Sequence, residues 1–408
     1  MTVYGPNHIF EFAVIGGGMF GAAAARHLAT AGHDVVLLAP PEPEQRPEHG
    51  GPFASHYDEA RITRVLDADP LWSALAHASI GRYAEIEAAS GVTFHHPQAY
   101  LGIGAEGLRE TKYDEPGRLD SAPGGDGFVA ASMRIGAEAE ASAEPLDATA
   151  ITERFPFLNP GSGESGFLEA APAGHINPRE LVRAQRALAE AAGATLLPRT
   201  AVTVTDAIDA VDVLTDDATR VLARRALLAA GAYSNELLIR PLALEVQART
   251  LVFARLDAEQ REALASMPSI IHVPADVPTT YLLPPVTYPD GETYVKIGVD
   301  AWHHPLRTAS EISEWFRTES GDPEERETAD HQLNALIPSL ASAPKHTSTC
   351  VYTITASGYP YVGMVSERLA VAVGGNGKGA KSSDEIGRLG AAVLLGEAVD
   401  ERLAPHFA

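Results

Sequence analysis

A glycine-rich turn near the amino end limits the possible fold more than any other feature of the sequence. The apolar run 13–15 leads directly into Gly16, Gly18 and Gly21, which are spaced as G-x-G-x-x-G, and an alanine-rich stretch continues to residue 31. A short apolar run of this kind is typical of a buried parallel strand, and alanine favours a helix. With the second apolar run at 34–38, the sequence predicts a strand–turn–helix–strand unit of a doubly wound α/β domain.

The glycine spacing also indicates a ligand. The first glycine permits the tight turn, the second lets the backbone approach a pyrophosphate, and the third lets helix and strand pack closely. A helix that begins at Gly18 directs free N–H groups and a positive dipole end toward an anion, so we expect an adenine dinucleotide here; the alternative is a purely structural turn. The acid that usually binds the ribose is replaced by Ala39, so Glu42 or Glu44 would have to reach it, or the site lacks this contact.

Composition excludes several classes of protein. The 408 residues are enough for two domains, and 31 Lys and Arg against 54 Asp and Glu give a net charge of −23. A surface this acidic repels phosphate backbones and anionic lipid, so we expect neither a nucleic-acid nor a membrane partner. The single cysteine, Cys350, excludes an internal disulfide and a multi-cysteine metal site, and no metal-binding motif is present. With no basic leader and no apolar run of about 18 residues, the sequence favours a cytoplasmic protein.

Residues 55–64 carry a second motif. They read Ser-His-Tyr-Asp-Glu-Ala-Arg-Ile-Thr-Arg, which resembles the S-H-x-G-x-T-R-I-x-R stretch of the glycine/D-amino-acid oxidase family, in the branch of monomeric sarcosine oxidase and N-methyltryptophan oxidase. Asp58 and Ala60 depart from that pattern. Further patches resemble the family in the same order along the chain; they are 166–168, 174–178, 228–233, 294–298, 350–355 and 374–381.

The resemblance implies an α/β fold. A Rossmann-type FAD-binding domain would be interleaved with a second α+β domain built on a mostly antiparallel sheet. The FAD-binding domain is expected from residues 1–90, 151–235 and 345–408, and the substrate-binding domain from 91–150 and 236–344. Helical spacing is present over 71–89, 178–192 and 382–395. Strands are expected at 280–283 and 294–298, separated by a turn at Pro284, and 104–127 is expected to be a long surface excursion.

The resemblance also implies which residues contact the flavin. Ser55, His56 and Arg61 belong to the first family motif, and Cys350 corresponds to the cysteine that joins the flavin 8-methyl group through a thioether in related proteins. FAD would then be covalently bound, and the alternative is an inert buried cysteine. A second glycine loop would direct N–H groups toward the flavin N1 and C2 carbonyl, unless it is only a structural turn; its residues are Gly374, Gly377, Gly379 and Lys381.

Four residues are expected at the substrate. Arg64 offers a planar fork and Lys381 a point charge, which together would bind the carboxylate of an amino acid. Lys296 would place a cation at the flavin N5 edge, where charge develops as oxygen is reduced, and Tyr281 would line the substrate cavity. For each, a surface ion pair, a solvated lysine or an ordinary sheet aromatic is the alternative. Asp300 occupies a position where well-known members carry histidine.

We therefore expect an FAD-dependent oxidase that converts the C–N bond of a secondary amine or N-substituted amino acid to an imine and reduces molecular oxygen to hydrogen peroxide. Three alternatives remain open: a primary, cyclic or fructosyl amino-acid oxidase, a biosynthetic flavin dehydrogenase of the same fold, and a non-catalytic FAD-binding subunit. Its partners would be a small-molecule amine and oxygen, and the protein would be a monomer.

Overall fold

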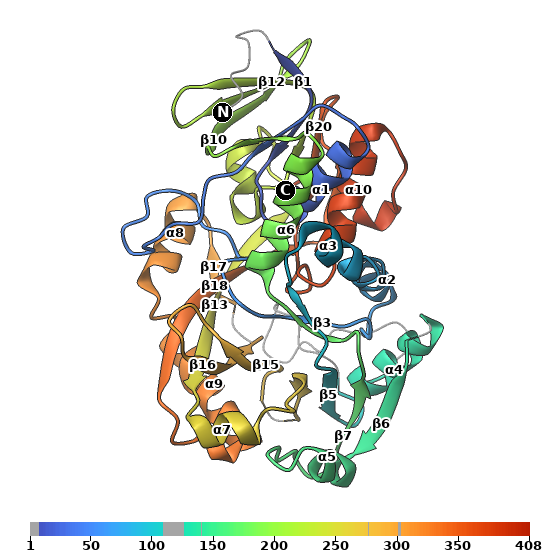
Figure 1. Cartoon of the computed structure of the whole chain (residues 1–408), viewed down its shortest axis with the longest axis vertical. Coiled ribbons are helices and arrows are strands. Elements are labelled where there is room, and N and C mark those ends of the chain that lie inside the picture. The colour runs from blue at the N-terminus through green and yellow to red at the C-terminus, as the bar shows by residue number, and fades with distance from the viewer. Residues whose placement is uncertain (1–7, 109–125, 140, 276, 301–302) are drawn as a thin grey trace.

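Two β-sheets with their helices form the two halves of the molecule (Figure 1). The computed structural model describes residues 8–108, 126–139, 141–275, 277–300 and 303–408. An eight-stranded sheet contains the first and the last strands of the described chain. A nine-stranded sheet is formed by strands between residues 100 and 355. The expected mixed α/β architecture with a mostly antiparallel second sheet is confirmed.

The eight-stranded sheet is built around the first strand. β1 (Ile9–Ile15) pairs in parallel with β2 (Val35–Leu38) and β12 (Arg220–Leu228). β2 is buried along its whole length, as the unbroken apolar run predicted. The remaining strands of this sheet are β9 (Thr195–Leu197), β10 (Ala201–Asp206), β11 (Val211–Thr215), β19 (Tyr361–Met364) and β20 (Leu369–Val373).

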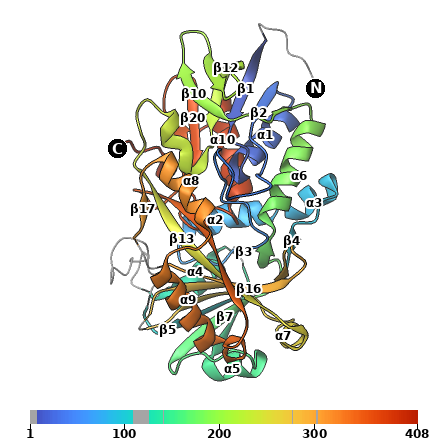
Figure 2. The ribbon, with the colours of Figure 1, turned by 90° about the vertical axis from the view of Figure 1, so that its left-hand side faces the viewer.

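Helices from three parts of the sequence pack beside this sheet. α1 (Met19–Thr30) contacts both α6 (Pro178–Ala191) and α10 (Ser383–Leu395), and the three lie together in Figure 2. Small alanine side chains on the buried face of α1 allow this close approach. The helical stretch predicted over 71–89 consists of two helices, α2 (Pro70–Ile80) and α3 (Tyr83–Ser90).

The nine-stranded sheet forms the other half. Its longest strands, β13 (Leu244–Arg255) and β18 (Lys345–Thr355), pair antiparallel along their length. The others are β5 (Tyr100–Ala105), β6 (Ala143–Asp147), β7 (Glu164–Glu169), β14 (Ser269–Val273), β15 (Thr280–Thr287), β16 (Thr293–Val299) and β17 (Pro305–Leu306). The helices of this half are α4 (Phe128–Glu138), α5 (Ala148–Arg154), α7 (Ala258–Ala263), α8 (Ala309–Thr318) and α9 (Pro323–Leu336). A small third sheet, β3 (Arg61–Thr63), β8 (Gly174–Ile176) and β4 (His95–His96), lies between the two halves (Figures 1 and 2).

Several local expectations are corrected. β7 and β18 were expected in the cofactor domain, but both pair only with strands of the nine-stranded sheet in the described part of the chain. Pro284 does not end a strand: β15 continues through it, and the pairing with β16 is irregular between Leu283 and Val286, where a proline without an N–H is tolerated. α4 follows the excursion expected at 104–127, of which residues 109–125 lie outside the described residues.

Within the residues that the structure describes, no helix is both long and apolar enough to cross a membrane.

Candidate active site

A single large cavity extends from the glycine turn to the nine-stranded sheet. Its volume is about 1040 Å³, which is enough for an extended ligand. Residues from both ends of the chain and from the middle line it; the ones used below are Gly16, Arg61, Arg64, Tyr281, Cys350 and Lys381. Motifs far apart in the sequence are therefore brought to one place.

The glycine turn has the geometry that the spacing predicted. Gly16 has φ +100°, and a Cβ there would lie 2.5 Å from the Ala229 carbonyl oxygen. A Cβ at Gly21 would lie 1.8 Å from the Gly16 carbonyl oxygen, so the third glycine allows helix and strand to meet. Gly18 is the N-cap of α1 and lines the cavity, and a Cβ there would lie 3.7 Å from His56 Nδ1, at ordinary contact distance. The turn therefore leaves the first N–H groups of α1 available for an anion, and it fits the pyrophosphate of a dinucleotide.

The second glycine loop also requires its glycines. Gly374 and Gly377 have φ +87° and +69°, and a Cβ at Gly379 would lie 2.9 Å from Gly375 Cα. The loop is tied to β18, because the N–H of Gly375 donates to Thr353 Oγ1 at 3.0 Å. This loop lines the cavity directly before α10; its contact with the flavin stays a prediction.

Cys350 lies on β18 beside Arg61. It is 4% exposed and lines the cavity, and the Arg61 Nη2 donates to its Sγ at 3.4 Å. Arg61 also donates to the Ser55 carbonyl at 3.0 Å. His56 is buried nearby, and burial, together with the charge of Arg186, lowers its pKa to about 3, so this imidazole is neutral. The structure thus gathers the residues of the 55–64 motif and the lone cysteine on one wall.

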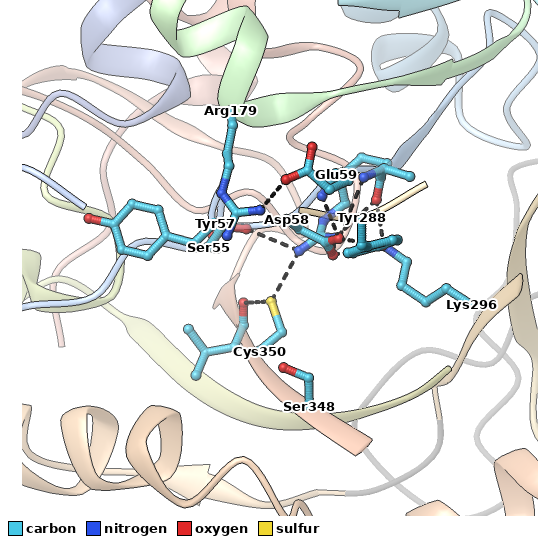
Figure 3. A network of polar contacts seen from close by, with 12 residues as sticks. Ser55, Tyr57, Asp58, Glu59, Arg179, Tyr288, Lys296, Ser348 and Cys350 are labelled. Carbon is cyan, nitrogen blue, oxygen red and sulfur yellow. Dashed lines mark hydrogen bonds and ion pairs between the residues drawn. The ribbon is translucent and has the colours of Figure 1, made fainter. Parts of the chain in front are cut away.

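Lys296 is held behind this wall by a carboxylate that the family pattern lacks. Its Nζ donates to Asp58 Oδ2 at 2.7 Å and to the Ala60 carbonyl at 2.5 Å, and the residue is 1% exposed (Figure 3). Asp58 also accepts from Arg61 and from the Tyr288 hydroxyl at 2.8 Å. Burial and the Arg61 guanidinium hold the pKa of Lys296 well below its usual value. Among the described residues that line the cavity, Arg61 is present and Lys296 is not.

The two residues expected to bind a carboxylate meet around Asp67. Lys381 Nζ and Lys378 Nζ each lie 2.8 Å from Asp67, and Arg64 Nη1 lies 3.1 Å away. Asp67 is fully buried, and these cations hold its pKa well below the usual range although burial opposes them. Three cations therefore gather around one carboxylate at the cavity wall, and Glu169 lies close to two of them, Arg64 and Lys381.

Burial also changes the pKa of Lys381, in the direction that favours its neutral form. It lowers the pKa of Lys381 to about 8, and the nearby Asp67 only partly offsets this. The Arg64 guanidinium also stacks over the Tyr100 ring, 5.0 Å from its centre, and this stacking fixes its direction. The arrangement can bind an anionic group of a ligand.

Tyr281 faces Gly298 across the β15–β16 pair, where a Cβ would lie 2.3 Å from its hydroxyl oxygen. It shares a hydrogen bond with Tyr352, and burial raises the pKa of its hydroxyl. Asp300 lines the same part of the cavity, so an acid stands close to the two tyrosines.

Sequence reasoning missed several of these residues. Asp67 and Lys378 were not singled out, although Lys378 stands in the second glycine loop and could have been suspected from its position. Tyr352 belongs to a quoted motif but was not assigned to the cavity. Glu42, considered for the ribose, is already bound by Arg179 at 2.7–3.0 Å.

The comparisons with known proteins agree with this geometry. The model of a family described as FAD dependent oxidoreductase, DAO, matches residues 11–393. The chain belongs to this family. The resemblance noted from the sequence is thereby confirmed, and the protein is an FAD-dependent oxidoreductase.

More specific similarity covers less of the chain. The chain is 33% identical to monomeric sarcosine oxidase of Streptomyces avermitilis over 190 residues. This stretch is 46% of this chain and 42% of that relative, so the chain matches less than half of the relative's length. The structure of NikD, an amino acid oxidase essential for nikkomycin biosynthesis, is similar with a TM-score of 0.76 at 23% identity, covering 98% of both chains. L-proline dehydrogenase from P. horikoshii has a TM-score of 0.72 at 16% identity over 96% of this chain and 95% of that chain. At these identities, the two structures show the shared fold.

Proposed function

We propose that the protein oxidises the C–N bond of a secondary amine or N-substituted amino acid to an imine, with molecular oxygen reduced to hydrogen peroxide. The amine gives up two electrons and two protons, which oxygen takes up. The observation that carries this proposal is the group of three cations around Asp67, which lines a cavity that also contains the dinucleotide turn.

In this proposal, different side chains of the cavity bind the substrate and the cofactor. Arg64 and Lys381 would bind the substrate carboxylate and so orient the carbon that is oxidised. Tyr281 and Tyr352 would close the substrate end of the cavity. FAD, when bound, would supply the redox chemistry, and Cys350, which lines the cavity, would attach it covalently. Arg61, which donates to the Cys350 Sγ, would stabilise the thiolate needed for that attachment.

The contact between Asp58 and Lys296 favours a second candidate function, a flavin dehydrogenase. A lysine that stabilises reduced oxygen species would act through its positive charge. Here Asp58 contacts both Lys296 and Arg61, and one carboxylate offsets part of that charge. A dehydrogenase of the same fold, which passes electrons to an acceptor other than oxygen, fits this arrangement. The primary, cyclic and fructosyl amino-acid oxidases also stay open, because the pocket residues do not select one amine.

The test is an amine screen followed by two acceptor assays. The purified yellow protein is mixed anaerobically with secondary, N-methylated, cyclic and primary amino acids, and bleaching at the flavin band identifies the substrate. The reduced protein is then mixed with oxygen or with an artificial dye. We expect bleaching by an amino acid with a free carboxylate and rapid reoxidation by oxygen with one peroxide per turnover.

Two variants make the screen specific. Lys381→Met should raise KM for the amino acid by about tenfold or more and should leave the rate of reoxidation by oxygen unchanged. Lys345→Met, at a lysine bound to Asp330 on the surface of the other half, is the matched control. Reoxidation only by the dye would replace the oxidase with the dehydrogenase, and failure of every amine to bleach the flavin would contradict both.

A further inference from the structure

A half-buried arginine on α6 points to the glycine turn. Arg186 donates to the Gly17 carbonyl oxygen from Nη2 at 2.7 Å and from Nε at 3.2 Å. It lines the cavity, and it lies close enough to His56 to lower the pKa of that imidazole. The guanidinium therefore sits beside the backbone that fits the pyrophosphate.

Arg186 differs from its neighbours on the same helix in lacking a counter-ion. Arg179 is bound to Glu42 and Glu59, and Arg183 is bound to Glu180. Within the described residues, no carboxylate lies within ion-pair distance of Arg186. A half-buried cation without an acidic partner is unfavourable, so this arginine is suited to an anion supplied by a ligand.

Ala39, which replaces the usual acid of the dinucleotide motif, lies beside Gly17 and Arg186. A Cβ at Gly17 would lie 2.4 Å from the Ala39 Cβ and 2.7 Å from Arg186 Nη2, so the Ala39 and Arg186 side chains meet over Gly17. An acid at residue 39 would stand next to the guanidinium and neutralise it. The small side chain of Ala39 leaves the charge of Arg186 available.

We propose that Arg186 binds the adenosine diphosphate half of the cofactor, donating N–H groups to its ribose and pyrophosphate oxygens where other sites of this kind use an acid. Arginine suits this role because its planar fork matches phosphate oxygens and its charge does not depend on pH in the ordinary range. Glu42 does not compete for the ribose, since Arg179 holds it. The proposal depends on dinucleotide binding and is independent of the amine that is oxidised.

The experiment measures binding without turnover. The full chain carrying Cys350→Ser is freed of flavin, and its affinity for FAD, ADP and riboflavin is measured by flavin fluorescence and by competition. Arg186→Met should weaken FAD and ADP about 10- to 100-fold, while riboflavin, which lacks the adenosine diphosphate, is unaffected. The affinity of the unchanged protein for ADP should fall with added salt more steeply than that of the variant.

Two further variants separate a direct contact from an indirect effect on the turn. Ala39→Asp leaves Arg186 and Gly17 intact but places a carboxylate beside the guanidinium, so it should weaken ADP binding several-fold. Arg183→Met, on the exposed side of α6, is the control and should bind ADP with the affinity of the parent. If the flavin-free protein unfolds, the FAD content of the purified protein is measured instead, and Arg186→Met should contain less FAD than the parent. Tighter ADP binding by Ala39→Asp, an unchanged ADP affinity in Arg186→Met, or an equal loss for riboflavin would each overturn the proposal.

Discussion

Replacing Asp58 by asparagine tests the charge arrangement around Lys296. The substitution keeps the shape of the side chain and removes its charge, so the buried Lys296 and the half-buried Arg61 are left as neighbouring cations without this carboxylate. Removing one member of a buried ion pair costs about 3–5 kcal/mol, because the remaining charge is left without a partner. We therefore expect Asp58→Asn to lower the free energy of unfolding by an amount in this range at pH 6.

The loss should depend on pH in a definite direction. Without Asp58, the pKa of Lys296 falls further below its already lowered value. The ion pair stabilises the fold only while Lys296 is charged, so its contribution is complete at low pH and disappears as pH rises through the folded-state pKa of the unchanged protein. The difference between the two proteins should therefore shrink as pH rises through that pKa, by up to about 1.4 kcal/mol for each pH unit.

The measurement is urea unfolding of the holoenzyme at pH 6 and pH 9, with Lys296→Met and the double variant included. The double variant should regain much of the stability lost in Asp58→Asn, because the unpaired ammonium has been removed. Asp400→Asn removes an exposed carboxylate paired with Arg402 and should cost about 1 kcal/mol or less. The reasoning is refuted if Asp58→Asn costs no more than Asp400→Asn, or if Lys296→Met restores nothing.

Three other expectations follow from the cavity. KM for an amino-acid substrate should rise above pH of about 8, because Lys381 loses its charge through its lowered pKa, and the Lys381→Met variant should show no such rise in steady-state kinetics. Gly21→Ala should yield protein with little flavin by absorbance, since the added carbon would meet the Gly16 carbonyl, whereas Gly50→Ala, with open space around it, should retain its flavin. Cys350→Ser should release its flavin into the supernatant on acid precipitation, and the unchanged protein should keep it in the pellet.

Much of the cofactor half could be predicted because its signals are local. The glycine turn needs particular glycines at fixed spacing, and a fully buried parallel strand needs an unbroken apolar run. The observed β1, α1 and β2 follow directly from those two requirements. The nine-stranded sheet was harder to predict, because β7 and β18 join it through pairing with distant strands, and nothing within these segments indicates which sheet will receive them.

The ion pairs of the site could be predicted only in part for the same reason, because several of them join distant parts of the sequence. The sequence marks Lys296 and Arg64 as cations in motifs, but the carboxylates that hold them, Asp58 and Asp67, are defined only by the folded chain. These partners affect function differently. Asp67 holds three cations that all line the cavity, whereas Asp58 holds Arg61, which lines it, and Lys296, which is not among the described lining residues. Under the proposed function, we therefore expect the choice between oxygen and another acceptor to depend on residue 58, where this chain departs from the family pattern, more than on the retained lysine.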